Sequence, residues 1–203
     1  MGTKKPVRPA ALVLAAGAGS RFGGGKVTAS LGGRPLLAHL LDTLSGLDLK
    51  VIGVIREGDE AARSLFEERR FRVTAIPPGE QSDSIRAGVR SIGRSRAYLI
   101  LLADQPLVGK DEIQAVLEAW EEGAQAVLLD GGRGPQPPAA FDGSLREALL
   151  QLKGDRGAKR MALGLGASLA VIRVPAGLWM VDVDTPQELS ELEKALGGPR
   201  AEA

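Results

Sequence analysis

Residues 10–26 read AALVLAAGAGSRFGGGK, an apolar run that passes directly into a glycine-rich loop. The run has the length and the uniform hydrophobicity of a strand that is buried on both faces. Five glycines follow within nine residues, and Arg21 and Lys26 flank the last three of them. Backbone amides in such a loop can approach an anion closely, while the two cations neutralise its charge. The segment therefore predicts a buried strand that leads into a phosphate-binding loop.

Two common nucleotide-binding motifs are excluded by counting along this loop. A P-loop needs a glycine five residues before its Gly-Lys pair and Ser or Thr after it, but Ser20 and Val27 occupy those positions. A dinucleotide fingerprint that begins at Gly17 needs a third small residue at position 22, where Phe22 stands. The loop is therefore of another kind.

The rest of the chain alternates short apolar runs with stretches of helical periodicity. The runs predict strands at 10–16, 51–55, 73–76, 98–103, 126–129, 169–174 and 178–183. The periodic stretches predict helices at 35–45, 60–69, 82–92, 111–120, 144–151, 158–163 and 186–196. This order predicts an α/β fold, a three-layer sandwich with a Rossmann-like, mostly parallel sheet.

The chain shows no internal repeat and no linker, so we expect a single domain over residues 1–203, with a core at about 10–196. Residues 1–8 and 197–203 are expected to be frayed ends. The loop 130–138 carries three Gly and three Pro and interrupts the alternation. It predicts either an excursion over the sheet edge or a flexible flap.

The amino-acid composition limits the partners and the kinds of reaction that we expect for this chain. A formal net charge of +1 disfavours nucleic acid as a partner, because binding it requires the neutralisation of many phosphates. No apolar run approaches the roughly 18 residues of a membrane span, and no secretory signal is recognisable, so we expect no membrane contact and a cytoplasmic location. The chain has no Cys and one His, His39, which we expect to be a structural helix residue. Carboxylates, Lys, Arg and backbone amides remain, and these suit phosphoryl-type chemistry.

Acidic residues follow two of the predicted strands. Asp104 comes directly after the run 98–103, Asp182 is near the end of the run 178–183, and Asp184 directly follows that run. Because ligands bind at the carboxyl ends of strands in an open parallel sheet, we expect Asp104 and Asp182 to hold one Mg²⁺. Asp184 or Thr185 would then cap the helix that Pro186 opens.

The motifs together resemble a known family. Leu14 to Lys26 is similar to the signature Leu-Ala-Ala-Gly-x-Gly-x-Arg-x-Gly-x-x-Lys of the MobA-like NTP transferases, which have the nucleotide-diphospho-sugar transferase fold. Four further segments look like those of the molybdenum-cofactor cytidylyltransferases: residues 79–88, 102–108, 152–160 and 181–189. The resemblance runs from about residue 10 to residue 190.

The resemblance implies an enzyme that transfers CMP from Mg-CTP onto the terminal phosphate of molybdopterin and releases pyrophosphate. It implies catalytic roles for Arg21, Lys26 and Asp104, with Asp104 and Asp182 on the metal. It also implies that nucleotide binding involves Leu14, Ala15, Ala16, Gly17, Gly19, Lys26, Gly79, Ser82, Ser84, Arg86 and Gln105. For Ser82, an ordinary helix N-cap is the alternative.

Other functions stay open from the sequence. Within the enzyme class these are a guanylyltransferase of the same pathway, which would use GTP, and a sugar- or polyol-phosphate nucleotidyltransferase. From another class, the chain could be a non-catalytic carrier that delivers molybdopterin to a receiving molybdoenzyme. The Ala15-Ala16-Gly17 segment and Gln105 favour cytidine over guanosine by the same resemblance.

Overall fold

The computed structural model describes residues 8–17, 19–154 and 157–197. The ends that we expected to be frayed lie outside the described residues, except for Arg8 and Gly197. Asp155 and Arg156, which belong to the segment 152–160, also lie outside them.

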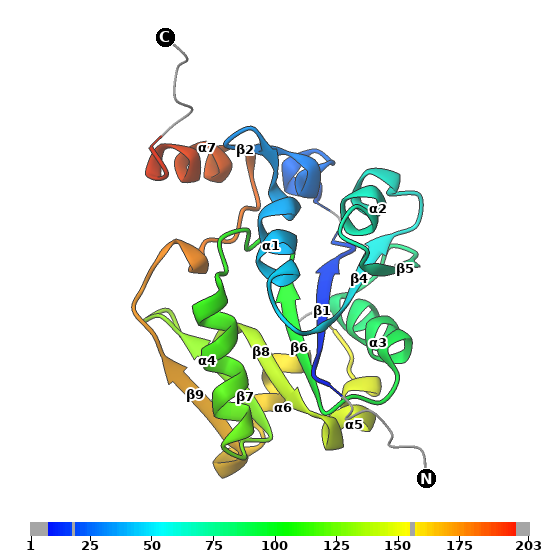
Figure 1. The fold of residues 1–203 in the computed structure, drawn as a ribbon, viewed down its shortest axis with the longest axis vertical. Coiled ribbons are helices and arrows are strands. Elements are labelled where there is room, and N and C mark those ends of the chain that lie inside the picture. Colours follow the sequence, from blue (N-terminus) through cyan, green and yellow to red (C-terminus); the bar gives the residue numbers. More distant parts are fainter. Residues whose placement is uncertain (1–7, 18, 155–156, 198–203) are drawn as a thin grey trace.

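A seven-stranded sheet with the order β5-β4-β1-β6-β8-β7-β9 forms the centre of the fold (Figure 1). Neighbours pair in parallel except on both sides of β8, which is antiparallel to β6 and to β7. The predicted mostly parallel sheet is therefore confirmed. The strands are β1 (Ala10–Ala15), β4 (Lys50–Arg56), β5 (Arg72–Ile76), β6 (Ala97–Leu102), β7 (Ala126–Asp130), β8 (Gln136–Asp142) and β9 (Leu169–Arg173).

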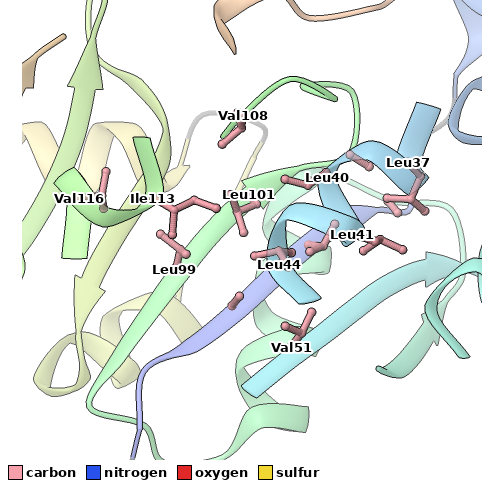
Figure 2. Packing of buried hydrophobic residues seen from close by; sticks show 14 of the residues in the cluster. Leu37, Leu40, Leu41, Leu44, Val51, Leu99, Leu101, Val108, Ile113 and Val116 are labelled. Atoms are coloured by element: carbon pink, nitrogen blue, oxygen red, sulfur yellow. The ribbon is translucent and has the colours of Figure 1, made fainter. Parts of the chain in front are cut away.

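Helices cover both faces of this sheet. On one face, α1 (Leu36–Ser45), α2 (Glu60–Glu67) and α4 (Lys110–Glu121) pack their apolar sides onto the strands. Figure 2 shows this core, where Leu41 and Leu44 of α1 and Ile113 of α4 point toward Leu99 and Leu101 of β6. On the other face lie α3 (Gln81–Ile92), α5 (Arg146–Leu150) and α6 (Gly157–Leu163). The result is the predicted three-layer sandwich.

A third, smaller apolar cluster lies beyond the carboxyl ends of the central strands. It joins Leu31, Leu36, Val183 and Leu192. Leu31 belongs to β2 (Ser30–Leu31), which forms a small hairpin with β3 (Arg34–Pro35), and Leu192 belongs to α7 (Pro186–Ala195). The cluster therefore packs α7 against β2, which belongs to the segment that follows the glycine loop. Both elements lie at the top of Figure 1.

Two sequence-based predictions were wrong. The run 178–183 is not a strand: it forms the 3-10 turn η5 (Leu178–Met180) and then an extended loop. Trp179 and Met180 are buried against the helix-covered core, so the run is apolar because of packing and not because of strand pairing. The loop 130–138 was expected to be an excursion over the sheet edge or a flexible flap, but β8 begins within it at Gln136 and lies inside the sheet, between β6 and β7. Pro137 and Pro138 made this strand hard to recognise in the sequence, because proline cannot donate a backbone hydrogen bond and usually argues against a central strand. Both prolines lie near the start of the strand, where proline is tolerated.

Among the described residues, no helix has the length and hydrophobicity that crossing a membrane would require.

Candidate functional site

The glycine loop leaves β1 at the carboxyl edge of the sheet. Two short 3-10 turns, η1 (Ser20–Phe22) and η2 (Lys26–Thr28), shape it. Gly24 and Gly25 have φ angles of 99° and 62°, which L side chains rarely adopt, so glycine is required at this bend. The bend places Lys26 as the first residue of η2 and turns its side chain back toward β6.

The side chain of Lys26 contacts carboxylates from two distant parts of the chain. Its Nζ lies 2.9 Å from Asp104 Oδ2 and 2.6 Å from Asp184 Oδ1. Arg21 lies farther out, with its Nη1 3.5 Å from Asp184 Oδ2. The Lys26 side chain is only 12% exposed, whereas that of Arg21 is 78% exposed. The site therefore has a largely buried cation, Lys26, and an exposed one, Arg21.

The protonation of Lys26 follows from these contacts. Burial alone would lower the pKa of Lys26, but the negative charge of Asp104 and the hydrogen bonds to Asp104 and Asp184 raise it above its ordinary value. Lys26 is therefore a full positive charge at neutral pH, as a group that holds phosphate must be.

Asp104 is held by the backbone around it. β6 ends at Leu102, and the amide of Ala103 donates to the carbonyl of Leu14 on β1 at 3.1 Å. The amide of Val183 donates to the Asp104 carbonyl at 2.9 Å, which brings the loop before α7 alongside. The second carboxyl oxygen, Oδ1, is buried and has no hydrogen-bond partner among the described residues. Such an atom is costly to bury unless it has a ligand.

Asp182 is the second acidic residue of the predicted metal site. The residue as a whole is exposed, but its carboxylate is partly shielded from water and accepts a hydrogen bond from the Gln105 side chain. Partial desolvation, together with the negative charge of Asp104, raises the pKa of Asp182 to about 6. The structure thus places Asp182 close enough to Asp104 for their charges to interact, although no strand carries it there.

Thr185, and not Asp184, caps α7. Thr185 Oγ1 accepts from the amide of Glu188 at 3.2 Å, and the Glu188 carboxylate accepts from the amides of Asp184 and Thr185 at 2.8 Å. This is a capping box with Pro186 in the first turn. The Asp184 side chain is therefore available to Lys26.

A cleft with about 560 Å³ of empty space, partly open to solvent, lies between the glycine loop and Asp104. Of the predicted site residues, the structure places these along the lining: Leu14, Ala15, Gly17, Gly19, Lys26 and Asp104.

Other predicted nucleotide-binding residues lie outside that lining, at the start of α3. Ser82 and Ser84 are buried, and Arg86 donates to Ser82 Oγ at 3.3 Å and also contacts Asp83 and the carbonyl of Leu152. Ser82 is not the N-cap, because Glu80 occupies that position in a capping box with Asp83. Gly79 precedes this box, and Ala16 and Gln105 are buried beside the strand ends.

Sequence reasoning missed three residues of the site. Arg56 and Asp59 line the cleft from the end of β4 and the N-cap of α2, and Arg56 Nη2 donates to the Gly17 carbonyl at 3.1 Å. The third is Asp184, which was expected only as one of two possible caps of the helix after it, the other being Thr185. A usable signal existed for Arg56, because it directly follows the apolar run 51–55 at the carboxyl end of a strand.

His39 lies away from the cleft lining, within α1. Its Nε2 lies 3.0 Å from the Leu31 carbonyl, and partial burial lowers the pKa of His39 below its ordinary value. The structural role expected for this residue fits these contacts.

Comparison with known proteins places this site in a family context. The chain is 31% identical over 153 residues to a 2-C-methyl-D-erythritol 4-phosphate cytidylyltransferase of Streptomyces coelicolor, a match that covers 68% of this chain. The chain spans only 57% of that protein's length. It is also 27% identical over 197 residues to the purine catabolism protein PucB of Bacillus subtilis, covering 90% of this chain and 95% of PucB.

Solved structures share the fold at low identity. Rv0371c of Mycobacterium tuberculosis matches with a TM-score of 0.82 at 20% identity, over 94% of this chain and 100% of that one. The molybdopterin-guanine dinucleotide biosynthesis protein A of Archaeoglobus fulgidus matches with a TM-score of 0.67 at 19% identity, over 92% and 98% of the two chains.

The model of one protein family covers most of the chain, including β1, the glycine loop and Asp104. It is the MobA-like NTP transferase domain, and it matches residues 11–168. The chain therefore belongs to the MobA-like NTP transferase family.

Proposed function

We propose that this protein is a Mg²⁺-dependent nucleotidyltransferase, acting as a single NTP-transferase domain, that moves CMP from CTP onto the terminal phosphate of molybdopterin. The observation that carries the proposal is the position of Lys26. Its ammonium group is fixed at the inner end of the glycine-loop cleft by Asp104 and Asp184. A triphosphate bound along the loop amides would meet this charge.

The reaction needs little acid–base chemistry. An oxygen of the acceptor phosphate attacks the α-phosphorus of CTP, a new P–O bond forms, and the bond to the bridging oxygen breaks as pyrophosphate leaves. Since the attacking oxygen is already anionic, no general base is required. Lys26 and Arg21 would stabilise the negative charge of the departing pyrophosphate, Lys26 from within the cleft and Arg21 from its position beside Asp184.

The acidic residues fit a divalent cation. Asp104 offers a buried carboxyl oxygen without a partner among the described residues, and Asp182 offers a second carboxylate, close enough for its charge to interact with that of Asp104. Among the described residues, no group of three or more His, Cys, Asp or Glu side chains forms a closed metal site. Two carboxylates with substrate phosphates are the set that Mg²⁺ usually takes at nucleotide sites. When bound, the cation would neutralise part of the triphosphate charge.

The donor and the acceptor rest on the relatives and on the residues quoted above. The Streptomyces protein is a cytidylyltransferase, which supports CTP, and the Archaeoglobus protein has molybdopterin in its name, which supports that acceptor. A manganese complex of Rv0371c supports a divalent cation. A receiving molybdoenzyme would be the later partner. The second candidate is transfer to a polyol phosphate, which the name of the Streptomyces relative favours.

Pyrophosphate release tests the proposal. Each of CTP, GTP, UTP and ATP is incubated with the protein and Mg²⁺ without an acceptor, with purified molybdopterin, or with 2-C-methyl-D-erythritol 4-phosphate. We expect release with CTP only when molybdopterin is present. Preference for GTP would overturn the cytidylyl assignment, and release with CTP and 2-C-methyl-D-erythritol 4-phosphate alone would establish the second candidate. Absence of release with every pair would favour the carrier.

A further inference from the structure

One side of the glycine-loop cleft is formed by the end of β4 and the start of α2. Arg56 is the last residue of β4, Asp59 is the N-cap of α2, and both line the cleft. Because β1 lies between β4 and β6 (Figure 1), these two residues and Asp104 lie on opposite sides of β1. The ends of β4 and β6 are two strand spacings apart, about 10 Å. A nucleotide can bridge such a span, whereas a single phosphate cannot.

The backbone fixes the positions of Arg56 and Asp59. Arg56 pairs with Ile76 of β5, and its carbonyl accepts from the amide of Asp59 at 3.1 Å. Asp59 Oδ1 accepts from the amide of Ala62 at 2.9 Å, which is its N-cap contact. Arg56 Nη2 donates to the Gly17 carbonyl at 3.1 Å, so the guanidinium is held against the start of the glycine loop. Both side chains are therefore positioned before a ligand arrives.

Both side chains keep hydrogen-bonding capacity that the fold does not use. Arg56 Nε is buried without a partner, and the contact with Gly17 is the one hydrogen bond that the guanidinium makes to the described residues. Asp59 Oδ2 accepts no hydrogen bond from the described part of the chain, and no ion pair joins Asp59 to Arg56. A buried donor without an acceptor is costly. The pair is therefore suited to a ligand that offers acceptors to Arg56 and a donor to Asp59.

The opposite side of the cleft indicates which end of a nucleotide lies at this pair. Lys26 and Asp104 contact each other on the β6 side of β1. Under the proposed function, the triphosphate and the cation occupy that side. The nucleoside then extends across β1, and its base lies at Arg56 and Asp59.

The two side chains distinguish cytosine from uracil by their hydrogen-bonding chemistry. A guanidinium group only donates and a carboxylate only accepts. Cytosine offers the acceptors O2 and N3 to Arg56, and its 4-amino group donates to Asp59, as it does to Asp in nucleic-acid recognition. Uracil has N3–H and O4 at the corresponding positions. There, a donor would face the guanidinium and an acceptor would face the carboxylate.

From these observations we infer that Arg56 and Asp59 recognise the base of the nucleotide and select cytosine over uracil. The inference rests on the proposed function, since the triphosphate must lie at Lys26 for the base to lie at this pair. Neither residue belongs to the sequence segments that carry the family resemblance. Arg56 and Asp59 are therefore additional specificity-determining residues.

Calorimetric titrations of CTP and of UTP, each with Mg²⁺, test the pair without requiring turnover. Asp59→Asn replaces the free acceptor by a donor but keeps a good N-cap, so the variant should fold. We expect the ratio of CTP affinity to UTP affinity to fall by about tenfold or more in Asp59→Asn. Arg56→Met keeps an aliphatic side chain but removes every donor. In this variant the ratio should fall about threefold or more, with weaker binding of CTP.

Two matched variants serve as controls. Glu57→Gln removes a negative charge from an exposed residue that lies between Arg56 and Asp59 in the sequence but is not part of the cleft lining. Arg72→Met makes the same exchange as Arg56→Met at an exposed position, at the start of β5 and thus at the opposite edge of the sheet. Both controls should keep the affinity ratio of the parent.

Three outcomes would overturn the inference. The first is a parent protein that binds CTP and UTP equally or binds neither. The second is an unchanged affinity ratio in Asp59→Asn, and the third is an equal loss of CTP and UTP affinity in both variants, which would place the ribose or a phosphate at this pair. Failure of the proposed function looks different. In that case the selection of cytosine and its loss in the variants persist, while no pair of NTP and acceptor releases pyrophosphate.

Discussion

Lys26 is the residue on which the chemistry of the cleft depends most. Its ammonium lies 2.9 Å from Asp104 and 2.6 Å from Asp184, so a neutral side chain would remove the fixed positive charge and leave two carboxylates facing each other. We predict that Lys26→Ala lowers turnover about 10²-fold, as the loss of one charge-stabilising group usually does. Steady-state pyrophosphate release measures the effect. Lys50→Ala is the control, because Lys50 contacts the Ile92 carbonyl at the opposite edge of the sheet. Equal activity in Lys26→Ala and the parent would remove Lys26 from the mechanism.

Asp182 gives the site a measurable dependence on pH. The pKa of Asp182 is about 6 in the fold, above the ordinary value of about 3.9 for an exposed Asp. Because the pKa of Asp182 is higher in the folded state than in the unfolded chain, folding favours its protonated form. This preference adds to the free energy of unfolding at low pH, and the added stability is lost as pH rises from about 4 through about 6. We predict that Asp182→Asn avoids this loss. The melting temperature of Asp182→Asn relative to the parent, in EDTA, should rise between pH 4.5 and 6.5 and then level off. A difference that does not change with pH would show that Asp182 titrates normally.

At the level of elements, the packing of α3 on β1 depends on the absence of a side chain at Gly88. A Cβ there would lie 2.0 Å from Cδ1 of Leu12, which is fully buried, so the side chain or the helix would have to shift within a packed core. We predict that Gly88→Ala lowers the free energy of unfolding by about 1–3 kcal/mol, despite the better helix propensity of Ala. Urea denaturation measures this change. Arg90→Ala, on the exposed side of the same helix, should change stability by less than about 0.5 kcal/mol. If both variants match the parent, α3 has more room than the contact implies.

The elements also show how far the sequence alone reaches. The strands β1, β4 and β6 could be predicted because they are central and buried on both faces, so that their residues are uniformly apolar. β8 could not, since Pro137 and Pro138 interrupt its pattern. The segment 178–183 was mistaken for a strand, because Trp179, Met180 and Val183 are apolar for reasons of tertiary packing.

Some residues of the candidate site could be predicted from the sequence, but the contacts between them could not. Lys26 and Asp104 follow apolar strands directly or through a glycine loop, which is a local signal. The partnership of Lys26 with Asp184 is not local: it depends on the capping of α7 by Thr185 and on the cluster that anchors α7. No periodic pattern in the sequence predicts the capping of α7 by Thr185 or the packing of α7 in that cluster.

For the whole molecule, the cleft connects the beginning, the middle and the end of the described chain. Lys26 contacts Asp104 across 78 positions and Asp184 across 158. A ligand that binds between these segments stabilises all of them together, because it binds the folded form and not the unfolded chain. We therefore predict that Mn²⁺ alone, at about 100 times its Kd, raises the melting temperature of the parent by about 5 °C or more.

Two aspartate variants decide whether that rise comes from the cleft. Asp104→Asn loses the carboxylate that bears the unpartnered buried oxygen, so Mn²⁺ should leave its melting temperature nearly unchanged. Asp48→Asn removes an exposed carboxylate that pairs with Arg8 before the start of β4, at the opposite edge of the sheet, and it should keep the full rise. Differential scanning calorimetry with and without Mn²⁺ gives both shifts. If Asp104→Asn responds as strongly as Asp48→Asn, the cation binds elsewhere. The unfavourable burial of Asp104 Oδ1 would then be compensated by the contact of Asp104 with Lys26 and not by a bound cation.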